Sequence, residues 1–238
     1  MSNKNILSID LDYILSPCIS LYNDLVNAST APEKIWDNIA KIREADKHIS
    51  YDDTNLRFIF DIFTNALTKL KDKNKVTFAL NHDAILLDLA TKEYIDDTFT
   101  LYNIDHHHDI FYSEQGRIEV DKYNVANVGN WIWYLDKNKK IEQYNWICNK
   151  NSTFPPKDLR TNGKMDAHTA DNIVKELLSV EEWDYIFICN SPHWFPRKYD
   201  VFFDILMDIY KNITGNEAKI KIDVFSPGGL AREYPIDK

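Results

Sequence analysis

Cysteine, basic charge and long apolar runs are all scarce in this chain of 238 residues. Its three cysteines are far apart and form no CxxC pair, which suits a reducing compartment. A net charge of −9 argues against broad nucleic-acid binding, because that function needs a basic surface. No apolar run reaches the length of a membrane span, and residues 1–14 lack the apolar core and cleavage site of a signal peptide. We therefore expect a soluble cytoplasmic protein that binds neither nucleic acid nor membrane.

The bulk composition is that of a folded globular protein. Hydrophobic residues make up 44% of the chain and aromatic residues 13%, which argues against a disordered chain. The length suits one substantial core, and no repeat, low-complexity tract or linker divides it, so we expect a single domain over residues 1–238. The acidic balance suits a cationic substrate, although many acidic proteins bind no such ligand. The oligomeric state stays open.

Short apolar runs alternate along the chain with apolar residues at helical spacing. The predicted strands are Asn5–Leu11, Lys75–Leu80, Phe99–Ile104, Tyr144–Cys148, Asp184–Cys189 and Lys219–Phe225. The predicted helices are Pro32–Ala45, Asn55–Leu70, Ala84–Ala90, Asn130–Leu135, Ala170–Leu178 and Tyr199–Asn212. Residues 149–168 are polar, with prolines and a glycine, and are expected to form a long loop. The alternation predicts the α/β class: a three-layer α/β/α fold with a mainly parallel sheet and a site at the carboxyl ends of its strands.

The most informative motif is Asp105-x-His107-x-Asp109, at the end of the predicted strand Phe99–Ile104. If the chain stays extended there, these three side chains point one way and His106 and His108 the other. Burying such a polar cluster is costly unless it has a purpose, and its natural use is to hold metal ions. The alternative is a polar loop with a chance histidine run, but the two flanking acids at this spacing favour the metal site.

Two further polar clusters follow other predicted strands. Asp10 and Asp12 end the first strand and share a face; alone, they could equally be solvated acids in a turn. His82 follows the strand Lys75–Leu80, where Asn81 or Asp83 can cap the next helix and leave the His82 ring free to bind a metal. We therefore expect four aspartates and two histidines at the same end of neighbouring strands.

This ligand set suits two metal ions by charge. Four carboxylates balance two divalent cations, and a bridging hydroxide would leave the centre with one net negative charge. Oxygen-rich ligands with some imidazole favour Mn²⁺, or alternatively Fe²⁺. Two such ions about 3.5–4 Å apart can share a water and lower its pKa, and the remaining histidines could move protons.

These motifs resemble the arginase/deacetylase superfamily. Its members bind two Mn²⁺ through a histidine at one strand end, an Asp-x-His-x-Asp at the next, and an Asp-x-Asp inside Ser-x-Asp-x-Asp. The matching positions are His82, then Asp105, His107 and Asp109, then the segment Ser8–Asp12. The Asp-x-Asp strand comes first in this chain and last in arginases. That order indicates an arginase-like fold with permuted strand order.

A closer resemblance is to the bacterial peptide arginases of ribosomal-peptide natural-product (RiPP) pathways. It is carried by four short blocks, which are Ser8–Tyr13, Ile104–Asp109, Gly129–Trp131 and Ser191–Trp194. The resemblance implies a manganese-dependent hydrolase that converts arginine side chains of a precursor peptide into ornithine and releases urea. The partner would then be an arginine-containing precursor peptide.

The resemblance also implies roles for single residues. Six would bind the two Mn²⁺ ions: Asp10, Asp12, His82, Asp105, His107 and Asp109. Among these, Asp10 and Asp105 would bridge, Asp12 and His107 would complete one ion's shell, and His82 and Asp109 the other's. Catalysis would involve the following four residues: Asp105, His106, His108 and His193.

Substrate contacts are implied for Asn130, Trp131 and His193, although Trp131 could instead be a core aromatic. His106 and His108 could each be a packed or solvated histidine rather than a proton shuttle. The family more often has an acid where His193 stands, which leaves the residue that orients the guanidinium open, with Asp200 and Glu233 as weak substitutes.

One stretch imitates a metal motif. Asp166-x-His168-x-x-Asp171 follows a polar loop rather than an apolar strand, and its last acid is one residue too far to share a face. We interpret it as the start of a helix, with Thr169 as N-cap and Asp171 in the first turn.

Three other functions compete with the peptide arginase. Asp105-His106-His107 resembles the signature of the DHH phosphoesterases, a two-metal family, but the early histidine and the glycine-rich histidine segment of that family are missing. Asp10-x-Asp12 is similar to the motif of haloacid-dehalogenase phosphatases, which leaves the histidines unexplained. The third alternative is a binding module that keeps metal for stability and catalyses nothing.

Overall fold

The computed structural model describes residues 2–16, 50–89, 94, 96–152, 160–192, 194–221 and 232–233. Its centre is a seven-stranded sheet in which every strand is parallel to its neighbours. In spatial order the strands are β10 (Ile220–Lys221), β4 (Val76–Ala79), β9 (Tyr185–Cys189), β1 (Asn3–Asp10), β5 (Thr98–Asp105), β7 (Ile141–Cys148) and β8 (Lys164–His168). This order is not sequential, so the chain crosses the sheet repeatedly.

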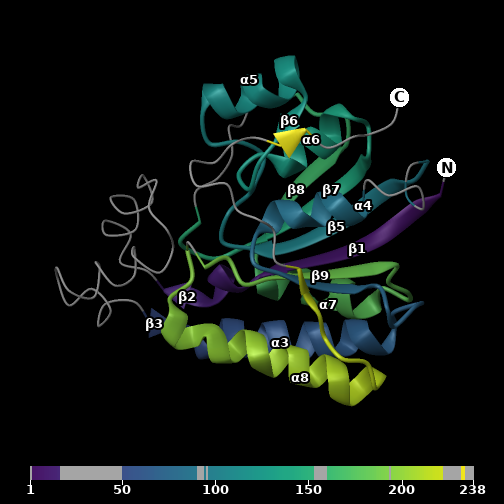
Figure 1. Cartoon of the computed structure of the whole chain (residues 1–238), viewed down its shortest axis with the longest axis vertical. Coiled ribbons are helices and arrows are strands. Elements are labelled where there is room, and N and C mark those ends of the chain that lie inside the picture. Colours follow the sequence, from purple (N-terminus) through teal and green to yellow (C-terminus); the bar gives the residue numbers. More distant parts are fainter. Residues whose placement is uncertain are drawn as a thin grey trace.

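Helices cover both faces of the sheet (Figure 1). One face carries α3 (Asp53–Thr68), α7 (Ala170–Ser179) and α8 (Asp200–Thr214). The other carries α4 (Ile85–Leu89), α5 (Glu114–Tyr123) and α6 (Trp131–Lys137). The predicted α/β class with a three-layer arrangement and a parallel sheet is therefore confirmed.

Each face of the sheet has its own apolar core, and strand alternation decides which residues enter which core. On β1, Leu7 and Ile9 pack toward α3, α7 and α8, whereas Ile6 packs toward the opposite layer. Ser8 and Asp10 continue the Ile6 row. The polar end of β1 therefore faces the layer formed by α4, α5 and α6.

Smaller elements complete the described structure. Short 3-10 helices cover Leu11–Ile14, His82–Ala84 and Arg197–Tyr199. Two antiparallel pairs join β2 (Leu15–Ser16) to β3 (Ser50–Tyr51), and β6 (Val125–Ala126) to β11 (Arg232–Glu233). Among the helices of the described residues, none is long and apolar enough to cross a membrane.

Most of the predicted elements are present, with ends shifted by a few residues. The predicted helix Pro32–Ala45 lies outside the described residues, and the predicted strand Lys219–Phe225 is described only to Lys221. Helix α5 was not predicted, because among its residues only Val120 is buried and no apolar stripe marks it. The single domain over residues 1–238 stays a prediction.

The expected long loop over residues 149–168 is wrong at its end, where β8 joins the sheet beside β7. The sequence shows no apolar strand pattern there, because β8 is an edge strand without a fully buried residue. Asp136 instead fixes the entry into β8: its side chain accepts bonds from the backbone N–H groups of Asn162 (3.0 Å) and Gly163 (2.8 Å). The start of β8 is therefore fixed by hydrogen bonds to a residue distant in the sequence, rather than by a local hydrophobic pattern.

Candidate metal centre

Asp10 and Asp105 are the last residues of the two central strands β1 and β5. The register pairs Ile9 with Ile104, so the two carboxylates stand at the same height on adjacent strands. Both residues are buried. The side chains also share a face, because the strands are parallel and in step.

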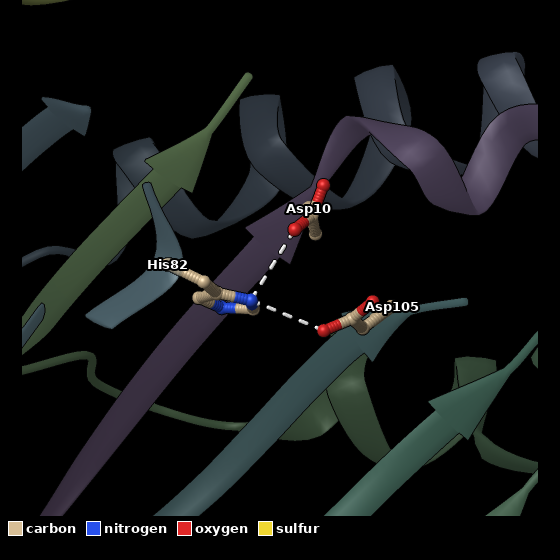
Figure 2. A group of neighbouring side chains, drawn as sticks. All are labelled: Asp10, His82 and Asp105. Atoms are coloured by element: carbon tan, nitrogen blue, oxygen red, sulfur yellow. Dashed lines mark ion pairs between the residues drawn. The ribbon is translucent and has the colours of Figure 1, made fainter. Parts of the chain in front are cut away.

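His82 reaches this pair from the 3-10 helix that follows β4, a strand that is not adjacent to β1. Strand β9 lies between β4 and β1, so the expectation that all three clusters end neighbouring strands is wrong for His82. Its ring stacks on Phe187 of β9, with centroids 5.7 Å apart and planes at 4°. In that position Nδ1 lies 3.3 Å from Asp10 Oδ2 and 3.1 Å from Asp105 Oδ2. Figure 2 shows the His82 ring between these two carboxylates.

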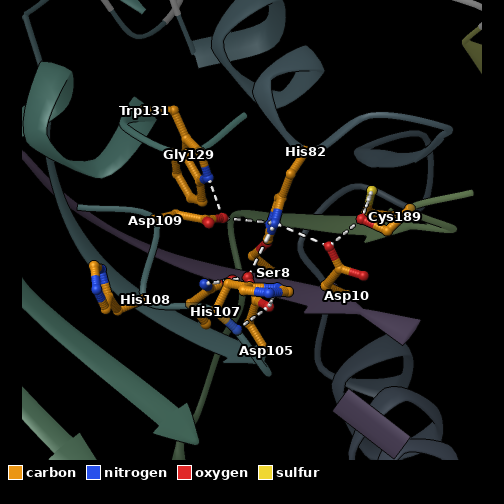
Figure 3. A network of polar contacts seen from close by, with 12 residues as sticks. Ser8, Asp10, His82, Asp105, His107, His108, Asp109, Gly129, Trp131 and Cys189 are labelled. Atoms are coloured by element: carbon orange, nitrogen blue, oxygen red, sulfur yellow. Dashed lines mark hydrogen bonds and ion pairs between the residues drawn. The ribbon is translucent and has the colours of Figure 1, made fainter. Parts of the chain in front are cut away.

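Asp109 joins the cluster through a turn rather than through strand alternation. Strand β5 stops at Asp105, so the expected extended course of residues 105–109 is wrong. Asp109 has a left-handed backbone, with φ of 51°. Its Oδ2 lies 3.0 Å from His82 Nδ1 and accepts a 2.7 Å bond from the indole N–H of Trp131 (Figure 3).

A second group of ligand atoms adjoins the first. His107 Nδ1 lies 2.8 Å from Asp12 Oδ2 and 3.9 Å from Asp105 Oδ1. Asp105 therefore turns one carboxylate oxygen toward His82 and the other toward His107. Within the described residues, two sets of side chains could each hold an ion, Asp10–His82–Asp105 and Asp12–Asp105–His107, and Asp105 belongs to both.

The nitrogen and oxygen atoms of the cluster are better satisfied by metal ions than by hydrogen bonds to one another. Ser8 Oγ lies 2.7 Å from His82 Nε2, so that nitrogen can donate to the hydroxyl and leave the Nδ1 lone pair facing the carboxylates. Buried His82 Nδ1 and Asp12 Oδ2 form no hydrogen bond of regular geometry. Carboxylate oxygens nevertheless lie 3.0–3.3 Å from His82 Nδ1, and His107 Nδ1 lies 2.8 Å from Asp12 Oδ2. One N–H could not satisfy three carboxylates, whereas a cation between them would. The cluster could therefore hold metal.

Electrostatics within the cluster also favour added positive charge. Burial, together with the charges of Asp109 and Asp10, raises the pKa of Asp105 to about 7. Burial and the charge of Asp10 raise the pKa of Asp12 to about 6. Burial disfavours the charged form of His107, but Asp12 outweighs it and raises the His107 pKa to about 9. Divalent cations would relieve the repulsion between these carboxylates.

Side chains behind the ligands fix their orientation. Asn103 Nδ2 donates to Asp105 Oδ2 at 3.1 Å, and Ser191 Oγ donates to Asp10 Oδ2 at 2.6 Å. Neither was given a role from the sequence. Asn103 and Ser8 each precede a strand-end aspartate by two residues, so strand periodicity could have identified them. Ser191 gave no such signal, because it lies two residues beyond the end of β9 and contacts Asp10 only through the pairing of β9 with β1.

The other histidines expected in catalysis differ in how far the structure describes them. His106 is buried, and burial lowers its pKa to about 4. His108 accepts a 3.1 Å bond from the backbone N–H of Ile110 at Nδ1, and burial lowers its pKa to about 3. Both rings are therefore neutral at pH 7, and their roles as proton shuttles stay predictions. His193 lies outside the described residues.

Asn130 and Trp131, which were expected to contact substrate, make hydrogen bonds within the protein. Trp131 is fully buried and bonds to Asp109. The Asn130 side chain accepts from the backbone N–H of Asn127 (2.6 Å) and donates to the carbonyl of Gly116 (3.0 Å). Substrate contact by Asn130 and Trp131 therefore stays a prediction.

The two substitutes considered for the guanidinium-orienting residue differ in how well they are described. Asp200 accepts a 3.2 Å bond from Asn190 Nδ2 at the start of α8. The side chain of Glu233 is outside the described part of the chain. Neither residue belongs to the described groups that could hold a metal.

The imitating motif at residues 166–171 is half strand and half helix. Asp166 and His168 lie on β8, where Asp166 pairs with Lys164 at 2.6 Å and His168 bonds to Asn145 at 3.3 Å. Thr169 is the N-cap of α7 and Asp171 lies in its first turn, as predicted. None of these residues belongs to a described group that could hold a metal.

Comparisons with protein-family models, with curated proteins and with solved structures found no match to this chain. What the structure establishes is an α/β domain with a parallel sheet and a buried aspartate–histidine cluster at the carboxyl ends of its central strands.

Proposed function

We propose that this protein is a binuclear metallohydrolase that converts arginine side chains of a precursor peptide into ornithine with release of urea. The observation that supports it most is the position of Asp105, which turns one oxygen toward each of two imidazole nitrogens, those of His82 and His107. A carboxylate shared in this way is the arrangement that two neighbouring cations need. The resemblance of the surrounding blocks to peptide arginases supplies the reaction and the preference for Mn²⁺, with Fe²⁺ as the alternative.

We assign the ligands to two metal positions on the basis of these contacts. His82 Nδ1 and Asp109 Oδ2 would serve one ion, and His107 Nδ1 and Asp12 Oδ2 the other. Asp105 would belong to both. When bound, the ions would supply the Lewis acidity that makes a shared water a nucleophile at neutral pH.

Other residues of the chain would position the ligands and admit the substrate. Trp131 and Ser191 hold the Asp109 and Asp10 carboxylates in place from behind, so little reorganisation is needed during reaction. His107 has the most exposed side chain of the five ligands named for the two positions, at 19%, so substrate would approach the cluster from its side. A net charge of −9 favours a cationic guanidinium over a phosphate ester at that approach.

The reaction is tested with purified protein loaded with Mn²⁺ and a panel of arginine-containing peptides, with free arginine alongside. The expected result is urea release and a matching gain of ornithine, both lost in Asp105→Ala. Asp166→Asn is the matched control, since Asp166 lies on β8 and pairs with Lys164 outside the cluster. Release of phosphate from model esters without urea would support a two-metal phosphoesterase instead. Metal binding with neither product would support the non-catalytic binding module.

A further inference from the structure

The peptide unit that joins His108 to Asp109 is held at both edges by tyrosine hydroxyls. On one edge, the Tyr112 hydroxyl oxygen accepts a bond from the N–H of Asp109 at 3.3 Å. On the other, the Tyr144 hydroxyl donates to the carbonyl of His108 at 2.9 Å. The rotation of this peptide sets the φ angle of Asp109, which is 51°. Two tyrosines thus hold a backbone conformation that residues other than glycine seldom adopt.

Further contacts of Tyr112 hold its hydroxyl in this position. Its hydroxyl oxygen also accepts a 2.8 Å bond from the N–H of His108, so it serves two successive peptide groups. Its ring lies nearly parallel to the His108 imidazole, with centroids 4.3 Å apart and planes at 22°. Although the residue is 51% exposed, its hydroxyl points to the backbone rather than to solvent. Water could satisfy an exposed tyrosine, so this inward contact indicates a specific role.

The same turn brings the Asp109 carboxylate to its place in the cluster. With the left-handed backbone, Asp109 Oδ2 lies 3.0 Å from His82 Nδ1 and within reach of the Trp131 indole. The N–H of Ile132 donates to the Asp109 carbonyl at 3.1 Å. Asp10 and Asp105 end strands, and Asp12 and His82 lie in short 3-10 helices. His107 comes before the peptide unit that the tyrosines hold. Asp109 is therefore the ligand whose position depends most on that peptide unit.

We propose that Tyr112 is a positioning residue for the metal position formed by His82 and Asp109, acting by fixing the left-handed conformation of Asp109. The inference rests on the two-metal centre proposed above. It is independent of which substrate the centre hydrolyses. His108 then contributes as the surface on which the Tyr112 ring stacks, beside any part it has in proton transfer.

The test is Mn²⁺ binding to Tyr112→Phe, measured by equilibrium dialysis and by electron paramagnetic resonance. Phenylalanine keeps the ring against His108 and removes only the hydroxyl. We expect one ion to bind as in wild type and the other about 10- to 100-fold more weakly, the usual effect of losing a group that orients a ligand. The spectrum should change from that of a coupled pair to the six-line signal of a single ion. Tyr123→Phe, at an exposed tyrosine of α5, should bind like wild type.

Two backgrounds identify the affected ion. With His107→Ala, the remaining ion depends on His82 and Asp109, and adding Tyr112→Phe should weaken it further. With His82→Ala, the remaining ion depends on His107 and Asp12, and adding Tyr112→Phe should leave it unchanged.

Equal binding of both ions by Tyr112→Phe and wild type would overturn the inference, as would equal weakening of both. A wild-type protein that binds fewer than two ions would overturn it together with the two-metal centre. Failure of the proposed reaction is a separate result, in which the wild-type protein binds two ions and releases no urea.

Discussion

Ser8 Oγ lies 2.7 Å from His82 Nε2, and this contact assigns the other ring nitrogen to the carboxylate cluster. Both side chains are buried, so water does not replace the bond if it is lost. Ser8→Ala should therefore free the ring to rotate or change tautomer and weaken Mn²⁺ binding by roughly 10- to 100-fold. Dialysis against Mn²⁺ measures the change. Ser179→Ala, at an exposed serine of α7, is the control. Unchanged affinity in Ser8→Ala would refute the role of this bond.

Ser191 combines a left-handed backbone, with φ of 50°, and a 2.6 Å bond to Asp10. Ser191→Ala removes the hydroxyl and keeps the unfavourable backbone angle, whereas Ser191→Gly removes the hydroxyl and relieves the angle. Both variants should bind Mn²⁺ more weakly than wild type. Metal-free Ser191→Gly should be more stable to urea than Ser191→Ala, by about 1 kcal/mol. The opposite order of stability would mean that the backbone at Ser191 is unstrained.

Metal should stabilise the protein more at pH 8 than at pH 6. In the metal-free fold, burial and neighbouring acids raise the pKa of Asp105 to about 7 and that of Asp12 to about 6. A raised pKa means that the folded state holds protons more tightly than the unfolded state, so this stabilisation is lost as pH rises through those values. The pKa of His107 is also raised, to about 9, so its contribution to the stability of the metal-free fold is lost as pH rises above neutral.

Mn²⁺ replaces those protons, so its binding strengthens as pH rises. The measurement is the rise in melting temperature on adding saturating Mn²⁺, compared at pH 6 and pH 8. A larger rise at pH 6 would show that the cluster does not exchange protons for metal. Asp105→Asn should show little rise at either pH.

Gly163 allows the backbone of the loop before β8 to pass close to β7. A Cβ at this position would lie 2.4 Å from the carbonyl oxygen of Ile141. Because that oxygen belongs to the backbone, the steric clash could be relieved only by a shift of strand β7. Gly163→Ala should therefore destabilise the protein by about 1–3 kcal/mol in urea unfolding. Gly116→Ala is the matched control, because the nearest atom lies at 3.6 Å and the residue is inside α5. Equal stability of the two variants would contradict the close approach.

The parts of the site that could be predicted from the sequence are those encoded at strand ends. Asp10 and Asp105 stand out because a polar residue ends an apolar run, and both prove to end parallel strands. The position of His82 could not be predicted, because strand order decides it: β9, late in the chain, lies between β4 and β1. Asp109 reaches the cluster through a turn that Tyr112 and Tyr144 hold, and such side-chain contacts leave no periodic signal.

The fold shows the same division. Buried strands such as β9 were predictable from continuous apolar residues, because a strand covered on both faces needs them. Edge strand β8 and surface helix α5 were missed or misassigned, since few of their residues are buried. Their positions depend on contacts that form only after the chain has folded, as at Asp136.

The central claim is that Asp105 joins two metal positions in one buried centre, and counting bound Mn²⁺ tests it most directly. Equilibrium dialysis of the wild-type protein at pH 8 should give two Mn²⁺ per chain, and Asp105→Ala should bind neither tightly. Asp166→Asn should bind two, like wild type. A wild-type protein that binds no Mn²⁺, or Asp105→Ala that still binds two, would contradict the account.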